Sequence, residues 1–568
     1  MFPLLRSYTL ARSVIPYLRR MSTQTIAVLN ESELKPGEMK QVAFGSGQIL
    51  LSKLGEKIHA TSAYCTHYGA PLAKGVLTSD GRVVCPWHGA CFSVCTGDIE
   101  DAPAPDAIHS FQTRVSDGKI YVTADPASTE KDNKSRRPTL QASYAEGGEK
   151  GVLIIGGGSA AFQAVESLRE HGYKGAITIV SKELYAPIDR TKLSKALITD
   201  ASKLEWRNAA DLKIKYGVTL RTGVEVTSVD LKSKKVQLKG SNEPLGYQKL
   251  IIASGGVPRR LPIEGVDFKN VFTFRDIQDS TNVDAAAKEG ANVVVIGSSF
   301  ISMELAAAMS KRKLASLHVI GMESVPFERV LGKEVGAALM KFHESQGVKF
   351  HMNSKVDKIV AKNDDSTLAA GVAVNGETLP ADFVIMGVGV APATKFLEGS
   401  GIPLEKDGAV KVDEFLAVQG LPSGVSDVYA VGDIASYPQV TGDYARIEHW
   451  NVAGNHGRHV GKVIAGQRQP FTKVPVFWSA QGQQLRYCGL GHDFQEVIVQ
   501  GDLDALKFIA YYVKDEKVVA VASMQNDPVV SKASELMRLG LMPSAENIRK
   551  GADILSIDIS TPSVSKLE

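Results

Sequence analysis

The residues with the clearest chemistry are two cysteines and two histidines near the amino-terminal end. They stand in the segments 65–67 (Cys-Thr-His) and 85–88 (Cys-Pro-Trp-His), which seventeen residues separate. Each segment offers one thiolate and one imidazole, and small residues such as Gly69 and Gly89 follow closely. This set could hold one tetrahedral zinc ion. Two similar tight loops with one ligand of each kind also suit a two-iron cluster, with thiolates on one iron and imidazoles on the other.

The C-x-H…C-x-x-H pattern resembles the Rieske ferredoxin family. In respiratory Rieske domains the two loops are joined by a disulfide, but here Ala70 and Trp87 stand at the matching positions. The resemblance therefore implies a ferredoxin-type [2Fe–2S] centre, toward the lower part of a range of roughly −150 to +300 mV. The implied ligands are Cys65, His67, Cys85 and His88.

Composition limits the class of protein. A chain of 568 residues predicts three or four domains, and 44% hydrophobic with 22% charged residues is ordinary for a globular protein. The net charge of +3, from 65 basic and 62 acidic residues, gives no reason to expect a nucleic-acid partner. No apolar run is long enough for a transmembrane segment. Five cysteines do not make a disulfide framework, and we expect Cys91, Cys95 and Cys488 to be small packing residues.

Residues 1–23 differ from the rest of the chain. They carry four arginines and several hydroxyls, and no acidic residue precedes Glu31. This composition predicts a mitochondrial presequence, although Pro3 and Pro16 weaken the helix that such a segment forms. The alternatives are a tail without function, or a second start at Met21 that would leave the protein in the cytoplasm.

Short alternating strands interrupted by glycine follow, and they predict an all-β module over residues 24–124 that carries the two cysteine–histidine loops. Residues 125–149 are polar, charged and almost free of large aliphatic side chains. They predict a flexible linker to the next domain.

A first dinucleotide-binding unit begins at residue 151. An apolar strand runs into a glycine-rich turn and then into a helical pattern, and the turn carries Gly156, Gly158 and Ala161. The first glycine permits the turn, the second lets the backbone approach a pyrophosphate, and the third small residue lets helix pack on strand. The next strand ends at Glu183, an acid placed for a ribose hydroxyl; its alternative is a plain surface acid.

A second such unit covers residues 292–305. Its turn begins with Gly297, but serines replace the two later small positions, so that close approach to the phosphates is less assured. The strand that follows ends at Glu323, which favours NADH over NADPH, while Arg329 nearby leaves that question open. Two units imply two nucleotides.

Further segments resemble the FAD- and NAD(P)H-dependent pyridine nucleotide-disulfide oxidoreductases. They are residues 250–256 (LIIASGG) and 428–436 (VYAVGDIAS), and the resemblance implies that Asp433 contacts FAD. The segment PIDRTKLSKALI replaces the family's C-x4-C dithiol and looks like the apoptosis-inducing-factor and ferredoxin-reductase branch. That likeness implies that Arg190 and Lys195 lie at the flavin.

From residue 24 onward the chain resembles the Rieske-containing type 3 apoptosis-inducing factors. The resemblance implies Arg275 at FAD and a Lys195–Glu304 pair, with catalytic roles, near the flavin's reactive edge. It also implies a nicotinamide side lined by Phe300, Gly389, Glu448, His449 and Trp478. From the residues alone, Phe300 and Trp478 could equally be core aromatics, and His449 an interior histidine.

The expected fold is an all-β Rieske module, two α/β domains of the Rossmann type and a C-terminal α+β domain. The predicted boundaries are 24–124 for the Rieske module, 150–280 with 400–465 for the FAD-binding domain, 281–399 for the NAD(P)H-binding domain and 466–568 for a C-terminal interface domain. A homodimer is also expected.

These features predict an oxidoreductase that passes electrons from NADH through FAD to a [2Fe–2S] cluster and an unknown acceptor. One alternative is a reductase component for an external ferredoxin or oxygenase. The other is a cell-death signalling protein that responds to NADH by changing conformation.

Overall fold

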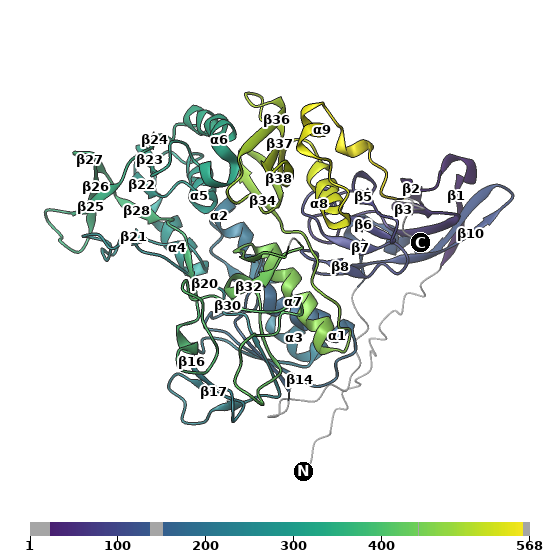
Figure 1. The fold of residues 1–568 in the computed structure, drawn as a ribbon, viewed down its shortest axis with the longest axis horizontal. Helices are drawn as coiled ribbons and strands as arrows, with labels where there is room; N and C mark the ends of the chain where they lie inside the picture. Colours follow the sequence, from purple (N-terminus) through teal and green to yellow (C-terminus); the bar gives the residue numbers. More distant parts are fainter. Residues whose placement is uncertain (1–22, 137–150, 441, 561–568) are drawn as a thin grey trace, which may run out of the picture.

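The structure, a computed structural model, describes residues 23–136, 151–440 and 442–560. Figure 1 shows four bodies: the amino-terminal β module, two α/β bodies, and a C-terminal sheet with α8 that lies between the β module and the second α/β body. The predicted presequence covers residues 1–23, and all of it except residue 23 lies outside the described residues. No helix in the described part of the chain has the length and apolar character needed to cross a bilayer.

The β module consists of two antiparallel sheets. The alternating burial of Lys119–Ala124 fits a strand with one face on the core. The six-stranded sheet has the order β1 (Gln24–Asn30), β11 (Lys119–Ala124), β10 (Ser110–Ser116), β4 (Lys57–Ser62), β3 (Gly47–Leu54) and β2 (Met39–Phe44). The four-stranded sheet has the order β5 (Val76–Leu77), β6 (Arg82–Val84), β7 (Cys91–Ser93) and β8 (Ile99–Asp101). The first cysteine–histidine loop follows β4, and the second joins β6 to β7.

The start of the predicted linker is folded onto this module. Asp125 caps a 3-10 turn, Pro126–Thr129, by accepting from the backbone N–H of Ala127 at 3.1 Å. Strand β12 (Ser135–Arg136) then pairs with β9 (Ala107–Ile108), and Arg136 forms an ion pair with Asp98. Polar residues that predicted a loose chain therefore serve as cap and partner here. The rest of the linker, residues 137–149, lies outside the described residues.

The first α/β body is a five-stranded parallel sheet covered by helices. Strand β13 is buried along its whole length, as expected of a parallel strand between two helical layers. The strand order is β15 (Val218–Arg221), β14 (Ala176–Val180), β13 (Gly151–Ile155), β19 (Lys249–Ile252) and β31 (Val428–Ala430). Helices α1 (Ser159–Glu170) and α7 (Trp450–Ile464) pack along each other, with α3 (Ala209–Tyr216) nearby (Figure 1).

The second α/β body repeats this plan. Its parallel sheet has the order β21 (Val271–Phe272), β28 (Phe383–Met386), β22 (Asn292–Ile296), β23 (Ser316–Ile320) and β24 (Lys349–His351). Its helices are α4 (Ile277–Ala286), α5 (Phe300–Met309) and α6 (Glu328–Ser345). The predicted boundary at residue 281 falls inside α4, and β21 already pairs with β28, so the sheet of this body includes the chain from Val271.

The C-terminal domain is an antiparallel sheet that shares a core with the β module. Its strand order is β34 (Val476–Gln481), β35 (Gln483–Gly489), β38 (Lys517–Met524), β37 (Lys507–Lys514) and β36 (Glu496–Asp502), and helices α8 (Val529–Leu539) and α9 (Ala545–Arg549) follow. One apolar cluster joins Val84 and Cys91 of the module to Val476, Cys488 and Val529. The buried Cys91 and Cys488 therefore pack as expected, whereas Cys95 is exposed.

Candidate active site

The two cysteine–histidine loops have the same backbone pattern. The N–H of Cys65 donates to the carbonyl of Ala70 at 2.9 Å, and the N–H of Cys85 donates to that of Ala90 at 2.7 Å. The loops bring the Nδ1 atoms of His67 and His88 to 3.0 Å from each other, and the thiols of Cys65 and Cys85 are in hydrogen-bond contact. The four predicted ligands thus form two neighbouring pairs, one of sulfur and one of nitrogen.

This arrangement fits a two-iron cluster. Burial lowers the pKa of His67 to about 4, so its imidazole is neutral and can donate a lone pair to a metal. Among the described residues, no three or more Cys, His, Asp or Glu side chains converge on one point as a single zinc ion would require. A pair of thiolates and a separate pair of imidazoles is the donor set of a Rieske [2Fe–2S] centre.

Aromatic rings surround the two imidazoles. The ring of Tyr68 stacks on His67, with centroids 3.8 Å apart and planes 18° from parallel. The ring of Trp478 lies 4.3 Å from that of His88, and Trp206 lies 5.9 Å from His67. Trp478 packs against the cluster histidines and is not among the described residues that line the cavities of this site. Its place on the nicotinamide side stays a prediction.

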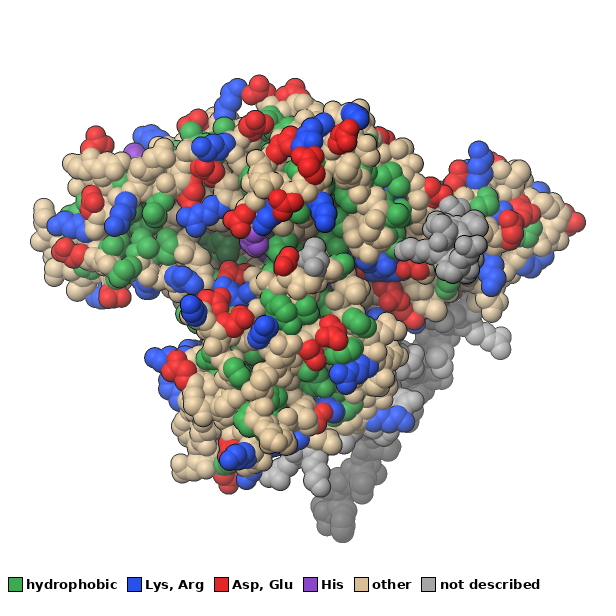
Figure 2. Space-filling model, in the orientation of Figure 1, with side chains coloured by type: hydrophobic (Ala, Val, Ile, Leu, Met, Phe, Trp, Pro, Cys, Tyr) green, Lys and Arg blue, Asp and Glu red, His purple; other side chains and the backbone are tan. Residues whose placement is uncertain are grey.

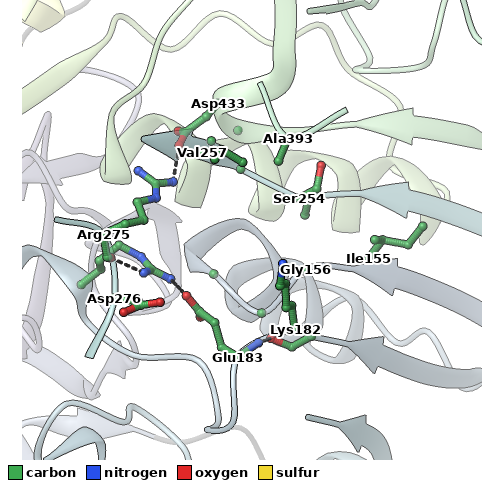
Figure 3. Close-up of a pocket in the computed structure, with 18 of the residues that line it drawn as sticks. Ile155, Gly156, Lys182, Glu183, Ser254, Val257, Arg275, Asp276, Ala393 and Asp433 are labelled. Carbon is green, nitrogen blue, oxygen red and sulfur yellow. Dashed lines mark hydrogen bonds and ion pairs between the residues drawn. The ribbon is translucent and has the colours of Figure 1, made fainter. Parts of the chain in front are cut away.

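The first α/β body contains a cavity of about 820 Å³ (Figure 3). The carboxylate of Glu183 pairs with Arg190 at 2.6 Å, and that of Asp433 pairs with Arg275 at 2.7 Å. Charged groups therefore lie at both places where the sequence predicts contact with FAD, which are Glu183 at a ribose hydroxyl and Asp433. The predicted residues that line this cavity are Gly156, Gly158, Glu183, Arg190, Arg275, Asp433 and Glu448. Their individual contacts with FAD stay predictions.

The glycine-rich turn explains how a dinucleotide fits here. Gly156 has φ +118°, and a side chain at this position would bring its Cβ within 2.1 Å of the carbonyl oxygen of Ala253. Gly158 has no neighbouring atom within 4 Å of the place where a Cβ would lie, so it leaves open space at the start of α1. Ala161 is fully buried in α1 and serves packing, as the pattern predicts. These residues fit a bound pyrophosphate.

A second cavity, of about 470 Å³, lies beside the first. Phe300, Gly389 and His449 line it, and Glu448 borders both cavities. The ring of Phe300 lies 4.9 Å from that of Phe477, and burial lowers the pKa of His449 to about 4, so this wall is aromatic and largely uncharged. Glu448 and Pro258 therefore mark the boundary between the two cavities.

Two predicted residues of the second dinucleotide unit lie away from this second cavity. Gly297 has φ +103°, and a Cβ there would reach within 2.2 Å of the carbonyl oxygen of Gly387, so this residue serves the turn itself. Glu323 pairs with Arg329 at 2.9 Å. Neither residue is among the described residues that line the cavity.

Lys195 and Glu304 form an ion pair, with Nζ and Oε1 3.1 Å apart, as predicted. Neither side chain is among the described residues that line the two cavities, and their position at the flavin's reactive edge stays a prediction. Glu304 also accepts hydrogen bonds from Ser194, from Ser479 at 2.7 Å and from the N–H of Ala480 at 3.2 Å. The charge of Lys195 reaches His88 and adds to the burial that lowers its pKa. The pair therefore joins three domains next to the cluster loops.

The sequence prediction missed four residues beside the cluster: Tyr68, Asp189, Lys192 and Trp206. The hydroxyl of Tyr68 donates to Asp189, and the ammonium of Lys192 lies 4.8 Å from the centre of the Tyr68 ring. A signal for three of them was present, because Tyr68 directly follows a predicted ligand, and Asp189 and Lys192 belong to the PIDRTKL segment. Trp206 carries no motif that could have identified it.

Comparisons with known proteins agree with this division of the chain. Residues 150–457 match the family model "Pyridine nucleotide-disulphide oxidoreductase", residues 24–112 match "Rieske [2Fe-2S] domain", and residues 476–555 match "Reductase C-terminal". Apoptosis-inducing factor 3 of Homo sapiens is 38% identical over 92% of this chain and 86% of its own length. Putidaredoxin reductase of Pseudomonas putida is 28% identical over 70% of this chain and 93% of its own length.

Solved structures show the same architecture. A ferredoxin reductase for the CYP199A2 system of Rhodopseudomonas palustris has a TM-score of 0.66 and 28% identity, covering 72% of this chain and 99% of its own. A covalent putidaredoxin reductase–putidaredoxin complex has a TM-score of 0.65 and 25% identity, covering 70% of this chain and 95% of its own.

Proposed function

The chain belongs to the pyridine nucleotide-disulphide oxidoreductase family, in the Rieske-containing branch with apoptosis-inducing factor 3, and from this premise we propose that its electron transfer begins within one polypeptide. The protein is an FAD-dependent NAD(P)H oxidoreductase with a Rieske [2Fe–2S] domain. Electrons pass from the nicotinamide through FAD to the cluster and then to an acceptor. The proposal is that the cluster of the same chain is the flavin's direct partner.

The residues of the two cavities hold the nucleotides for this reaction. When bound, FAD accepts a hydride and releases electrons singly, and a [2Fe–2S] cluster carries them one at a time. Gly156 and Gly158 let the backbone approach the FAD pyrophosphate, while Glu183 and Asp433 offer acceptors to its hydroxyls. Phe300 and the neutral His449 form a wall of the second cavity that keeps water from the nicotinamide.

We propose NADH as the preferred reductant. Glu323 follows β23 (Ser316–Ile320), the second strand of its unit, by three residues, where a carboxylate accepts from an unphosphorylated ribose and repels a 2′-phosphate. Arg329 is already paired with Glu323, which reduces its use as a phosphate ligand. The KM values for NADH and NADPH test this choice, and a lower KM for NADPH would contradict it.

The observation that carries the internal relay is the position of the cluster loops against the reductase. The ring of His88 lies 4.3 Å from that of Trp478, whose centroid is 6.4 Å from that of Trp450, and Trp450 lines the first cavity. Carboxylate–guanidinium contacts also fix the module, with Arg207 of the first α/β body paired with Asp106 of the module. An unbroken row of aromatic rings thus connects the cavity to a predicted cluster ligand.

An anaerobic NADH titration tests the relay, with absorbance to follow the flavin and EPR to follow the cluster. We expect the flavin to bleach and a reduced Rieske signal to appear within the same molecules. Bleaching with an oxidised cluster would instead mean that the reductase serves an external ferredoxin or oxygenase. If NADPH bleached the flavin and NADH did not, the choice of NADH as reductant would be overturned.

The name of the relative that matches nearly the whole chain supports a second candidate function, in cell death. In this reading NADH changes the conformation or oligomeric state, and turnover matters little. Size-exclusion chromatography with and without NADH, beside an acceptor-reduction assay, separates the two. A change of state with negligible turnover would favour the signalling function, and steady turnover from an unchanged species would favour the enzyme.

We also propose that residues 1–23 direct the protein to mitochondria. The support is their composition, which is basic, hydroxylated and free of acidic residues. Expression of the full chain and of a chain that starts at Met21, each fused to a fluorescent protein, tests this. We expect the first in mitochondria and the second in the cytoplasm, and the same distribution for both would contradict the proposal.

A further inference from the structure

The two predicted histidine ligands both contact Tyr68 and Trp478. His88 lies against Trp478, on the side of the first cavity. His67 carries the stacked ring of Tyr68, which also meets His88 edge-on at 5.4 Å. The pair of imidazoles therefore contacts a buried tryptophan, which leads toward the FAD cavity, and a tyrosine that reaches the solvent.

Docking of the module closes the usual contact surface of the cluster. The relative exposure of His67 is 6% and that of His88 is 5%, so a partner protein has almost no access to either ring. Tyr68 is 37% exposed. Its hydroxyl donates to the buried Asp189, so the exposed atoms of Tyr68 are those other than the hydroxyl. Tyr68 is thus in contact with both the cluster histidines and the solvent.

The docked module is also held firmly. Arg458 pairs with Glu170 and donates to the carbonyl of Ile99 at 3.0 Å, and Lys473 pairs with Asp101 of the module at 2.9 Å. Together with the apolar core that the module shares with the C-terminal domain, these contacts oppose separation of the module on every turnover. An acceptor must therefore approach the docked form.

We propose that Tyr68 is the electron exit of this enzyme and that the acceptor is an acidic one-electron carrier protein that docks over Tyr68, Lys192 and Lys131. The inference rests on the proposed function, because the cluster must first be reduced. NADH is oxidised to NAD⁺ with release of one proton, and its two electrons leave one at a time. Two acceptor molecules are therefore each reduced by one electron for every NADH consumed.

The charge around Tyr68 determines the kind of partner. The ammonium of Lys192 lies over the Tyr68 ring, and because His67 covers one face of that ring, Lys192 lies on the other. It is also 4.0 Å from the carboxylate of the buried Asp189, which offsets part of its charge. Lys131 is exposed and lies close to Gly69, the residue that follows Tyr68. Its Nζ is 3.9 Å from the place where a Cβ on Gly69 would lie. Lys131 forms no ion pair with another described residue, so its charge is available to a carboxylate on a partner. The exposed Asp132 beside it is the opposing charge on that turn.

Cytochrome b5, a small acidic haem protein, is the probe for the exit. The cluster of the full-length holoprotein is reduced beforehand with dithionite, so that the measured step does not depend on the flavin. Stopped-flow absorbance then gives the rate of haem reduction, and in a separate mixing experiment NADH gives the rate of cluster reduction. If NADH fails to reduce the cluster, the proposed function is contradicted. The electron exit is still measured by the experiment in which dithionite reduces the cluster.

We expect Tyr68→Leu to slow haem reduction at least about tenfold more than it slows cluster reduction, since it removes the ring that contacts His67. Tyr68→Phe keeps the stacked ring and should restore the rate. An unchanged EPR signal of the reduced cluster identifies variants in which the cluster itself is intact. Equal slowing of both steps, or no slowing of haem reduction with an intact signal, would overturn Tyr68 as the exit.

Charge reversal tests the docking surface independently of the ring. The double variant Lys131→Glu/Lys192→Glu should raise the Kd for oxidised cytochrome b5 at least about tenfold and weaken its dependence on salt. Lys119→Glu, an exposed lysine on the β10–β11 hairpin of the same module, is the matched control and should change the Kd by less than about twofold. Equal effects of the two variants, or tighter binding of the basic cytochrome c than of cytochrome b5, would overturn the acidic partner.

Discussion

The two dinucleotide units of this chain share the same strand–turn–helix plan. They differ in the free space at the glycine-rich turn. Both begin with a glycine of positive φ whose missing side chain lets two strands approach, Gly156 in the first unit and Gly297 in the second. The first unit then leaves free space at Gly158. The second places the exposed side chain of Ser299 at the corresponding position.

The cavities differ in the same sense. The first is larger and contains two carboxylate–guanidinium pairs, whereas the second is smaller, with one such pair, Arg446–Glu448, and an aromatic wall around Phe300 and Phe477. Full backbone approach and fixed charges favour long retention of a nucleotide. A turn with a side chain and few fixed charges favours exchange. The comparison therefore associates the first unit with the resident FAD and the second with a nicotinamide nucleotide that must leave after each reaction.

The largest effect is expected for Gly156→Ala. The new Cβ would lie 2.1 Å from a backbone oxygen in a conformation of φ +118°, and the main chain must shift to admit it. We expect a loss of about 3 kcal/mol or more in the free energy of unfolding, together with loss of the flavin. Thermal unfolding and the ratio of flavin to protein absorbance measure both. A variant with the stability and flavin content of the wild type would contradict this account of the turn.

Gly158→Ser transfers the side chain of the second unit into the first. Because no atom lies within 4 Å of the new Cβ, the apoprotein should keep its stability, unlike Gly156→Ala. The hydroxymethyl group would occupy the space of the pyrophosphate and weaken FAD binding by about tenfold or more. Titration of the apoprotein with FAD gives the Kd. Unchanged affinity would mean that free space at this turn does not determine retention.

Glu166→Gln concerns the helix that follows the first turn. Burial raises the pKa of Glu166 to about 8, above an ordinary glutamate, so the folded state holds a proton that the unfolded chain releases between about pH 4.5 and 8. Stability should therefore fall as pH rises through this window, by on the order of 2 kcal/mol, and the neutral variant should lack that part of the decline. Denaturant unfolding at pH 5.5 and 8 measures the difference. Parallel declines in both proteins would exclude Glu166 as its source.

The smallest effect is expected for Ser299→Gly, which gives the second unit the turn of the first. Ser299 lines the second cavity, and its removal should let the backbone approach the phosphates of NADH more closely. We expect the KM for NADH to fall about threefold, close to 0.6 kcal/mol, with little change in kcat. Steady-state kinetics with NADH tests this, and a higher KM would show that the serine hydroxyl binds the nucleotide.

Local patterns were sufficient to predict the cluster ligands and both turns. Cys65 and His67 occupy one short loop, and the spacing after Gly156 is fixed by a strand that must lead directly into a helix. Such features depend on neighbours in the chain, so the sequence displays them directly. The family models agree with the resulting Rieske and reductase divisions.

Positions that depend on docking between domains were not predictable in this way. Trp478 belongs to the C-terminal sheet and contacts His88 of the module, so its role depends on how two distant segments meet. The same is true of Glu304, which pairs with Lys195 and also accepts from Ser479 and Ala480 of the C-terminal sheet. The boundary at residue 281 was wrong because β21 joins a sheet whose other strands all follow it in the chain.

The core that the module shares with the C-terminal domain has a consequence for biosynthesis. The hydroxyl of Ser531 donates to the carbonyl of Cys85, and Val529 packs in the same apolar cluster as Val84. More than 400 residues separate these partners along the chain. The module that leaves the ribosome first therefore waits for the last part of the chain to be made before its core is closed. Until then the loop of Cys85 lacks this cover, and its ligands are open to solvent from that side.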